Sequence, residues 1–341
     1  MKAHPCFTLT CVLFAVSLTS SAASAQAKYQ YFRAGNTADV HTRTVGGFAL
    51  MGGGDDLDAA FRWMCELSGG GDFVVLRARG DDEYNSYVEG LCHPNSVATL
   101  VIPSREAAAA PFVSTVIGNA EAVFIAGGDQ ARYINWWMGT PVQDAINGAI
   151  ARGVPVGGTS AGLAVQGEFI YSAQGDASAD NDLSSKETLA DPFNPRVTIA
   201  HQFLNNGILK DAITDTHFAA RDRMGRSLVF MARILQDDRV KQIRDIAVDE
   251  HTAVLVDRGG TGRVVGAGHV YFMRAGKRPV RCEKGVPLTF RGIEVRSLHA
   301  GQVFNLRAWS SADGIAYILS VESGVIHSTQ PGGGIYANTQ K

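Results

Sequence analysis

Residues 154–165 read VPVGGTSAGLAV: an apolar start, then glycines around Ser160, then a run of small residues. This order predicts a buried strand, a tight turn and the first turn of a helix. The glycines let the backbone turn sharply enough to hold the Ser160 hydroxyl clear of the sheet. The amide of Ala161 then lies at a helix N-terminus, where it can stabilise an oxyanion. Ser160 is therefore a candidate nucleophile, with a structural serine in a glycine-rich turn as the alternative.

Apolar runs of strand length alternate with helical patterns on both sides of this turn. One helix is predicted from Leu57, and another opens at Thr140 and Pro141 and ends at Gly153. Buried strands are predicted at Phe48–Met51, Phe73–Leu76, Thr99–Ile102, Ala122–Ala126 and Pro155–Gly157. Such strands alternating with helices predict an α/β fold, a three-layer sandwich around a mostly parallel sheet.

After about Ile243 the pattern changes to short strands separated by glycine-rich turns. These strands are predicted at Ile246–Val248, Ala253–Val256, Val264–Val265, Val270–Met273, Val303–Ala308 and Ala316–Val321. No repeat or long linker separates two independent domains. We therefore expect an α/β domain at residues 28–276 and a β-rich C-terminal extension at residues 277–341.

The composition excludes several classes of protein. The chain has 341 residues, of which 45% are hydrophobic and 19% charged. Those fractions are typical of a globular protein and exclude a disordered, collagenous or coiled-coil chain. The formal net charge is −2, so the sequence has no basic field for nucleic acid, and none is predicted as a partner.

The first 27 residues differ from the rest. Lys2 gives a positive start, residues 6–18 are apolar but too short to span a bilayer, and Ala-x-Ala patterns follow at residues 23–25 and 25–27. This pattern predicts a cleaved signal peptide at residues 1–27, with an N-terminal membrane anchor as the lesser alternative. The mature protein is then expected in the periplasm or outside the cell, with no membrane attachment.

Three cysteines remain once the signal peptide is removed. Cys65, Cys92 and Cys282 lack C-x-x-C spacing, so the sequence predicts no zinc site. In an oxidising compartment Cys65 and Cys92 could pair, and buried inert thiols are an equally good interpretation.

A second glycine turn follows another predicted strand. Residues 126–130, AGGDQ, come directly after Val123–Ile125, and ligands bind at the C-terminal ends of neighbouring parallel strands. The Gly128 amide is a candidate second oxyanion donor, and Gln130 is a candidate substrate contact. The turn matches neither G-x-G-x-x-G nor a P-loop, so phosphate binding is not predicted.

A third cluster surrounds His217. This histidine follows the apolar pair Ala212 and Ile213, which places it at a strand end, where it can act as a general base for a serine. Guanidinium groups pair bidentately with carboxylates, so the arginines nearby predict a carboxylate-binding patch. In the alternative interpretation these arginines pair with Asp215 and Asp222. The arginines are Arg221, Arg223 and Arg226.

Together these motifs resemble the cyanophycinases, serine peptidases of the family that includes the aspartyl dipeptidases. The matching motifs are GGDQ (127–130), GTSAG (158–162) and D-x-H-F-x-x-R-x-R-x-x-R (215–226), followed by D-E-x-T-A at 249–253. The resemblance covers roughly residues 45–275. It implies a fold similar to the class I glutamine amidotransferases, which is flavodoxin-like, with serine replacing cysteine. It also implies no metal and no organic cofactor.

The resemblance implies exopeptidase cleavage of cyanophycin, a poly-aspartate backbone with arginine linked to each side-chain carboxyl, into β-Asp-Arg dipeptides. Ser160 is the implied nucleophile and His217 the general base, and Gly128 and Ala161 supply the oxyanion hole. Asp215 is expected to meet the arginine of the substrate. The residues expected to line the substrate pocket are Gln130, Asp215, Thr216, Arg221, Arg223 and Arg226.

The third member of the triad is less clear from the resemblance. The acid of the family lies ahead of a short helix, and Asp182, before residues 184–189, is the closest match. Glu187 and Glu250 are rivals, the latter because aspartyl dipeptidases have a glutamate in the corresponding strand. The segment before His217 is longer than in typical members, and Thr216 replaces the usual glutamine. We choose Asp182.

Two other functions stay open at the level of the sequence. One is a dipeptidase for small aspartyl or isoaspartyl peptides, although three arginines favour a longer, multiply anionic substrate. The other is a non-catalytic protein that binds β-aspartyl polymers, which the presence of both Ser160 and His217 disfavours. An amidotransferase is disfavoured because serine stands where cysteine is expected. The resemblance suggests a homodimer.

Overall fold

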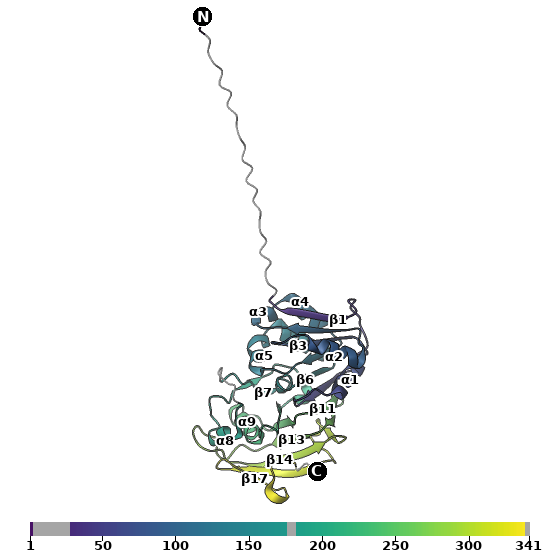
Figure 1. Cartoon of the computed structure of the whole chain (residues 1–341). Helices are drawn as coiled ribbons and strands as arrows, with labels where there is room; N and C mark the ends of the chain where they lie inside the picture. Colours follow the sequence, from purple (N-terminus) through teal and green to yellow (C-terminus); the bar gives the residue numbers. More distant parts are fainter. Residues whose placement is uncertain (3–27, 176–181, 338–341) are drawn as a thin grey trace.

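The computed structural model describes residues 1–2, 28–175 and 182–337 (Figure 1). The predicted signal peptide therefore lies almost entirely outside the described residues. Within the described ranges, no helix has both the length and the apolar character that crossing a membrane requires.

A nine-stranded mixed sheet forms the upper part of the molecule in Figure 1. In spatial order its strands are β1 (Gln30–Gly35), β4 (Ser96–Val101), β3 (Asp72–Arg77), β5 (Ala122–Ile125), β6 (Val156–Thr159), β2 (Gly47–Met51), β11 (Thr252–Asp257), β12 (Thr261–Gly266) and β15 (Val303–Asn305). The five strands from β4 to β2 run parallel, and the strands outside them pair antiparallel. The predicted parallel sheet is thus confirmed for the centre, whereas the edges are antiparallel.

Helices cover both faces of this sheet. Residues of α1 and α2 pack with Phe73 and Phe124 on one face, and residues of α3 to α6 pack with Val74 and Val123 on the other. Strands that are covered on both faces have continuous runs of apolar residues, and these runs made the strands predictable from the sequence. The helices are α1 (Asp58–Leu67), α2 (Glu83–Cys92), α3 (Arg105–Ala108), α4 (Pro111–Asn119), α5 (Gln130–Trp137) and α6 (Pro141–Arg152).

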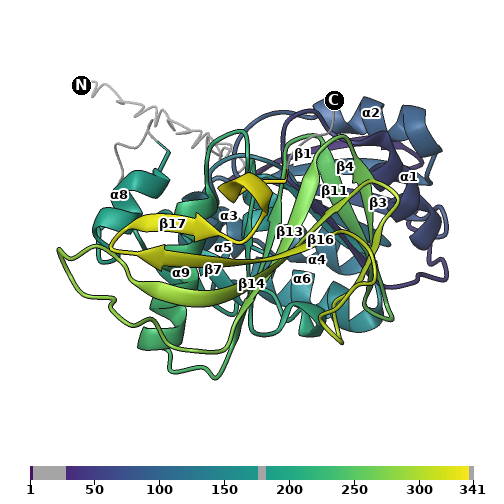
Figure 2. The same cartoon turned by 90° about the horizontal axis from the view of Figure 1, so that it is seen from below.

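A second, six-stranded sheet forms the lower part of the molecule and faces the viewer in Figure 2. Its strands in order are β17 (Val325–Ser328), β16 (Ile315–Glu322), β14 (Phe290–His299), β13 (His269–Ala275), β10 (Ile243–Val248) and β9 (Ala212–Asp215). Only β9 and β10 are parallel to each other. Apolar side chains of α9 (Met224–Asp237) and Leu189 of α8 (Ser185–Ala190) pack against this sheet.

The C-terminal extension is β-rich, as predicted, and is integrated into the fold. Its strands β14, β16 and β17 continue the sheet that begins at β9, and β15 adds to the other sheet. Shorter elements complete the chain: β7 (Phe169–Tyr171) pairs with β8 (Ile199–His201), and two single 3₁₀ turns lie at η1 (Gly207–Leu209) and η2 (Pro331–Gly333).

The segment after η2 returns to the start of α9. The Tyr336 hydroxyl accepts a hydrogen bond from the Met224 amide and donates one to Asp222 Oδ1, both at 2.9 Å. The Ala337 amide donates to the Tyr271 hydroxyl at 3.3 Å. These contacts join the end of the extension to the loop that follows β9.

The structure distinguishes between the two interpretations of the cysteines. Cys65 of α1 is bonded to Cys92 at the end of α2, with a Cα–Cα distance of 6.3 Å. The disulfide therefore links two helices that lie on the same face of the first sheet. Cys282 is a buried free thiol.

Candidate active site

Ser160 lies between β6 and the short helix α7 (Ala161–Ala164), as the sequence predicts. Its φ of 52° and ψ of −117° form a strained conformation that is rare for serine. Its amide donates to the Met51 carbonyl at 3.1 Å, which ties the turn to β2. A Cβ at Gly162 would lie 1.9 Å from the Ile125 carbonyl oxygen, so only glycine fits there. The turn thus holds the Ser160 hydroxyl in one defined position.

Ser160, His217 and Glu250 form a continuous hydrogen-bonded chain. Ser160 Oγ is 2.7 Å from His217 Nε2, and His217 Nδ1 is 2.6 Å from Glu250 Oε1. His217 follows β9 and Glu250 follows β10, and these neighbouring parallel strands bring the two side chains together. A neutral imidazole with its proton on Nδ1 donates to Glu250 and accepts from Ser160. This is the geometry of a serine activated by a general base.

The choice of Asp182 as the acid beside His217 is wrong. Asp182 Oδ2 and Oδ1 accept hydrogen bonds from Arg223 at 2.8 and 2.6 Å, and Oδ1 also accepts one from Arg226 at 2.9 Å. Its carboxylate therefore neutralises two buried guanidinium groups. The rival Glu187 closes a capping box with Ser184 at the start of α8 and is also not available to His217. The other rival in the sequence analysis, Glu250, occupies the position.

Burial and neighbouring charges set the ionisation of His217 and Glu250. Burial lowers the pKa of His217, the hydrogen bond to Glu250 opposes this, and Arg221 lowers it further, so that it stays below its ordinary value of 6.5. The hydrogen bond from His217 lowers the pKa of Glu250, and Arg221 adds to this effect. At neutral pH the pair therefore consists of a carboxylate and a neutral imidazole, which is the form that accepts a proton.

We expect hydrolysis to fall on the acid side with an apparent pKa below 6.5, because protonated His217 cannot accept the Ser160 proton. Arg221→Gln should move this acid limb to higher pH, since the positive charge that disfavours protonation is removed. The measurement is kcat/KM against pH, with Arg62→Gln on α1 as the control. An acid limb that does not move in Arg221→Gln would contradict the assignment of His217 as the base.

Two glycines after β2 allow a close approach to His217 and to the end of β10. A Cβ at Gly53 would lie 2.4 Å from His217 Cε1 and 2.5 Å from Nε2, and one at Gly52 would lie 2.0 Å from the Asp249 carbonyl oxygen. The His217 amide donates to the Gly52 carbonyl at 2.8 Å. In the sequence, the run of three glycines at residues 52–54 was the one available signal of a close approach.

Gly53→Ala should lower kcat by about 10²-fold, because the methyl group displaces the imidazole from Ser160. Gly70→Ala is the matched control, since Gly70 also has a positive φ but a Cβ there meets nothing within 4 Å. Steady-state kinetics and thermal unfolding of both variants separate the two effects. Equal kcat values for the two variants would show that the contact at Gly53 does not position His217.

The two candidate oxyanion donors belong to turns that adjoin Ser160. Ala161 is the first residue of α7, where an amide has no intrahelical acceptor. A Cβ at Gly127 would lie 3.6 Å from Ser160 Cβ, so the turn that carries Gly128 abuts the serine. The Tyr133 hydroxyl fixes this turn through the Ala126 and Gly127 carbonyls, at 2.8 and 3.1 Å. Gln130 follows at the start of α5 and is half-buried.

Four of the residues expected to line the substrate pocket are instead buried in a charge network behind His217. Arg226 donates through Nε to Asp215 Oδ2 at 2.8 Å and through Nη2 to Asp215 Oδ1. Arg223 Nη1 donates to the Thr216 carbonyl and hydroxyl at 2.8 and 3.1 Å. Their exposed fractions are 3% for Asp215, 4% for Thr216, 6% for Arg223 and 2% for Arg226.

The charge network changes the expected roles of its members. Burial alone would raise the pKa of Asp215, but Arg226 and Arg223 hold it below its usual range. Asp215 is therefore an ion-paired carboxylate that cannot reach the arginine of a substrate, contrary to expectation. The alternative interpretation was right for Asp215, whereas Asp222 pairs with Tyr336 instead. Arg221 remains accessible, with its side chain 47% exposed and Nε 3.9 Å from Glu250 Oε1.

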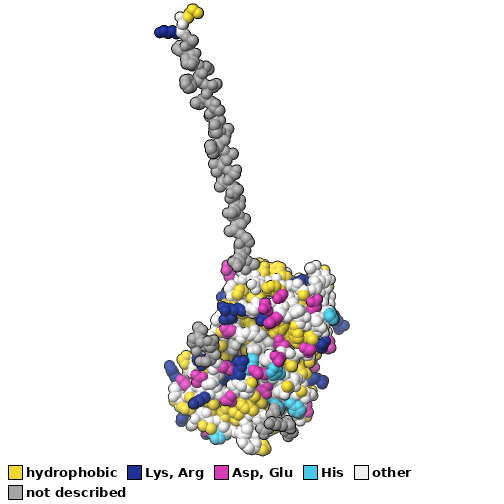
Figure 3. Space-filling view, viewed as in Figure 1, with side chains coloured by type: hydrophobic (Ala, Val, Ile, Leu, Met, Phe, Trp, Pro, Cys, Tyr) yellow, Lys and Arg dark blue, Asp and Glu magenta, His cyan; other side chains and the backbone are white. Residues whose placement is uncertain are grey.

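An acidic cavity that was not predicted from the sequence lies beside the serine turn. It has a volume of about 310 Å³, and its lining residues are Asp55, Asp56, Asp58, Glu83, Tyr84 and Tyr87. Burial raises the pKa of Asp56, while the hydrogen bond from the Tyr84 hydroxyl to Asp56 Oδ2 at 2.6 Å opposes the rise, as does the nearby Thr159, the residue before Ser160. Acidic, basic and histidine side chains gather at mid-height of the face in Figure 3. Within the described ranges, no group of three or more His, Cys, Asp or Glu residues is arranged to hold a metal ion.

Comparisons with known proteins show the family of this chain. A family model described as "Peptidase family S51" matches residues 78–261, more than half of the chain. The cyanophycinase of Nostoc sp. (strain PCC 7120) is 29% identical over 215 residues, which cover 62% of this chain and 65% of that protein. A cyanophycinase of Synechococcus elongatus is 24% identical over 286 residues, which cover 80% and 82%.

One solved structure supports the fold. The crystal structure of a peptidase from an acI-B1 Actinobacterium superimposes with a TM-score of 0.50 at 17% sequence identity. The match covers 77% of this chain and 98% of that chain. At this identity the likeness concerns the α/β fold alone.

Proposed function

Because this chain belongs to peptidase family S51, we propose that it is a serine exopeptidase that hydrolyses cyanophycin, multi-L-arginyl-poly-L-aspartate, to β-Asp-Arg dipeptides. The observation that carries the proposal is the hydrogen-bonded chain from Ser160 through His217 to Glu250. The relatives named cyanophycinase support the choice of polymer.

The first half of the reaction forms an acyl-enzyme. Ser160 Oγ attacks the scissile carbonyl carbon while His217 Nε2 accepts the hydroxyl proton. The Glu250 carboxylate holds the imidazole by Nδ1 and stabilises the imidazolium that forms. The negative charge on the former carbonyl oxygen is stabilised by the amides of Gly128 and Ala161. When the tetrahedral intermediate collapses, the leaving amine takes the proton from His217.

The second half releases the product. Water donates a proton to His217 Nε2 and attacks the ester carbonyl of the acyl-enzyme. Collapse of the second tetrahedral intermediate breaks the bond to Ser160 Oγ, which recovers its proton from His217. The side chains return to their starting state, and the new carboxylate leaves with the product.

The charged side chains near Ser160 support a substrate that has both negative and positive groups. Each cyanophycin repeat has one free carboxylate and one guanidinium group, because the arginine is linked through its α-amino group. Arg221 is the accessible guanidinium near His217 and is suited to the carboxylate. The cavity lined by Asp55, Asp58 and Glu83 is suited to the guanidinium, in place of the buried Asp215.

The arrangement of β6, Ser160 and α7 supports a class I glutamine amidotransferase-like fold with serine at the cysteine position.

We further propose that the protein is exported to the periplasm or beyond the cell. The signal-like pattern at residues 1–27 supports this, and so does the disulfide between Cys65 and Cys92, a bond typical of oxidising compartments. Cell fractionation with mass spectrometry of the mature N-terminus tests it. A cytoplasmic chain that retains Met1 would contradict export.

The test of function compares wild type, Ser160→Ala and the control Ser114→Ala, each incubated with cyanophycin and with free aspartyl dipeptides. Mass spectrometry should detect β-Asp-Arg release by wild type and Ser114→Ala, and none by Ser160→Ala. Cleavage of dipeptides alone would assign the chain to the aspartyl dipeptidases. Binding of cyanophycin without cleavage of either substrate would make it a binding protein.

A further inference from the structure

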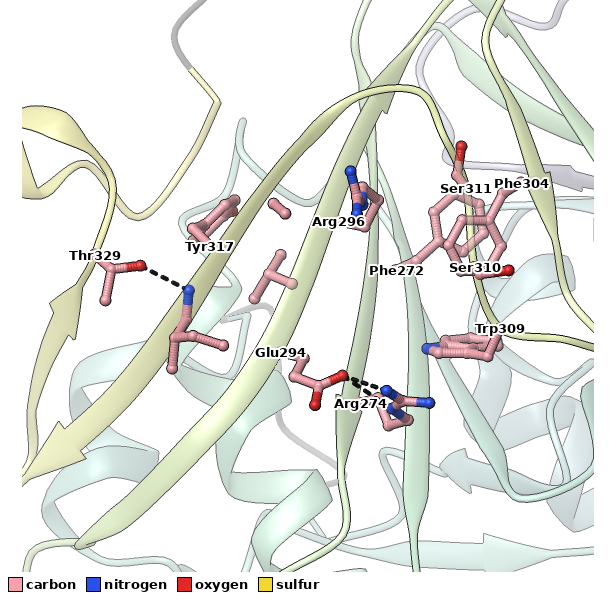
Figure 4. Close-up of a pocket in the computed structure, with 13 residues that line it drawn as sticks. Phe272, Arg274, Glu294, Arg296, Phe304, Trp309, Ser310, Ser311, Tyr317 and Thr329 are labelled. Atoms are coloured by element: carbon pink, nitrogen blue, oxygen red, sulfur yellow. Dashed lines mark hydrogen bonds and ion pairs between the residues drawn. The ribbon is translucent and has the colours of Figure 1, made fainter.

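The second sheet has a cavity of about 460 Å³ that is separate from the Ser160 site (Figure 4). Strands β13, β14 and β16 form its floor, and residues 304–311 form one wall. Its polar side chains include Arg274, Glu294 and Arg296. Most of this cavity belongs to the C-terminal extension, for which the proposed reaction has no use.

The strand register places these charges next to one another. Arg274 lies opposite Glu294, and Phe272 lies opposite Arg296, so the three charged side chains share one face of β13 and β14. Arg274 Nε donates to Glu294 Oε2 at 3.1 Å, and Arg274 Nη2 donates to the same oxygen (Figure 4). One carboxylate thus neutralises one of the two guanidinium groups.

Arg296 has an uncompensated charge. Its Nη1 donates only to the carbonyl oxygens of Asp313 and Gly314, at 3.3 and 3.5 Å. Among the residues that the structure describes, no carboxylate lies within ion-pair distance of Arg296. A half-buried guanidinium without a carboxylate partner is a binding element for an anion.

Arg244 on β10 adds to the positive field. It lies directly opposite Arg274 in the strand register, and like charges in this position repel. Burial lowers the pKa of Arg244, and Arg274 lowers it further despite an opposing effect of Asp211. The Arg244 guanidinium packs over the Trp309 ring, 4.9 Å from its centroid, so it adds positive charge beside the wall of the cavity.

The apolar wall of the cavity consists of packed aromatic rings. Phe272 and Phe304 stack with their ring centroids 3.8 Å apart, and Trp309 packs edge-on against both. The indole nitrogen of Trp309 lies on the side of Arg274 in Figure 4 and makes no hydrogen bond with the described residues. It is a free donor for a carboxylate or carbonyl oxygen.

We propose that this cavity is a secondary, non-catalytic binding site for the cyanophycin chain. A carboxylate of one repeat binds Arg296, the Trp309 N–H donates to a carbonyl oxygen of the chain, and Glu294 accepts the guanidinium of the same or the next repeat. The site rests on the proposed function, because its ligand is the polymer that Ser160 cleaves. Each repeat of that polymer has one carboxylate and one guanidinium, which matches the mixed charge of the cavity.

The two sites lie toward opposite ends of β10, which suits a polymer. Arg274 of the cavity lies opposite Arg244 near the start of β10, whereas Glu250 follows the end of this strand. A long chain can bind both sites, whereas a peptide that fills only the Ser160 site gains nothing from the second. Attachment at the second site then raises the effective concentration of the chain end at the first.

The test compares kcat/KM for soluble cyanophycin with kcat/KM for a dimer of β-Asp-Arg units. The ratio of the two should fall about 10-fold in Arg296→Gln, because polymer binding loses a charge-assisted contact and the gain in local concentration. Arg291→Gln is the matched control on the same strand, since Arg291 pairs with Glu322 away from the cavity, and its ratio should equal that of wild type. Ile318→Glu places a carboxylate at a 37% exposed position of the cavity and should also lower the ratio.

The outcomes separate this site from the proposed function. If wild type cleaves both substrates and neither Arg296→Gln nor Ile318→Glu changes the ratio, the secondary site is wrong and the peptidase assignment stands. An equal loss on both substrates would also overturn the site, because it indicates an effect on the fold or on Ser160. If wild type cleaves neither substrate, the proposed function fails, and the secondary site fails with it.

Discussion

Replacement of Glu250 by Gln is expected to lower kcat by about 10⁴-fold while the protein stays folded. The carboxylate accepts the Nδ1 proton of His217 at 2.6 Å and so selects the tautomer in which Nε2 faces Ser160. A glutamine amide can donate to Nδ1 and stabilise the wrong tautomer, and it has no charge to stabilise the imidazolium. Steady-state kinetics with cyanophycin measure the loss, and circular dichroism checks the fold.

Two matched variants test whether Glu187 or Asp182, rather than Glu250, is the acid that acts on His217. Glu187→Gln should keep kcat within a few-fold of wild type and cost about 1 kcal/mol of stability, because Glu187 caps α8 and pairs with Arg196, both away from His217. Asp182→Asn should act mainly on stability, because Asp182 pairs with Arg223 and Arg226. A loss of kcat in Asp182→Asn as large as that in Glu250→Gln would restore Asp182 as the catalytic acid.

Asp215→Asn should destabilise the protein by about 3–5 kcal/mol, the second of the two largest effects. Asp215 and Arg226 are almost completely buried, and Arg226 donates to both carboxylate oxygens. In the variant, the buried Arg226 guanidinium loses the negative charge of Asp215 and keeps only that of Asp182. Because Arg226 keeps the pKa of Asp215 below 3.8, this stability is present above that pH and is lost as the pH falls through the lower folded value. Urea unfolding at pH 7 measures the loss.

Asp245→Asn is the control for burial. Asp245 is also fully buried, but burial and the nearby Asp215 raise its pKa well above its usual range, which favours the neutral acid. The amide replaces a neutral group of similar shape, and the free energy of unfolding should change by less than about 1 kcal/mol. Equal losses in Asp215→Asn and Asp245→Asn would show that burial rather than ion pairing explains the effect.

Features that depend on neighbouring residues could be read from the sequence. The turn at Ser160 follows from a local order of apolar residues, glycines and small residues, and the structure has the expected strand and helix around it. The helix predicted between Pro141 and Gly153 ends at a left-handed glycine, as its sequence indicates. The central strands were visible because covered strands are continuously apolar.

Features that depend on strand pairing could not be read in this way. Glu250 meets His217 because β9 and β10 pair in parallel, and 33 residues separate them in the chain. The sequence also could not show that Arg223 and Arg226 pair with Asp182 and Asp215, since a buried arginine and a substrate-binding arginine have the same spacing. Only the fold shows which of the arginines remains accessible.

The contact between Tyr336 and the start of α9 has a practical consequence for handling the protein. The Tyr336 hydroxyl bonds Met224 and Asp222, a few residues after His217. Cutting the chain before Tyr336, or pulling on it there through an affinity tag or a solid support, would loosen the loop that holds the imidazole. Residue 28 precedes β1 at the far edge of the first sheet, which makes it the safer point for immobilisation.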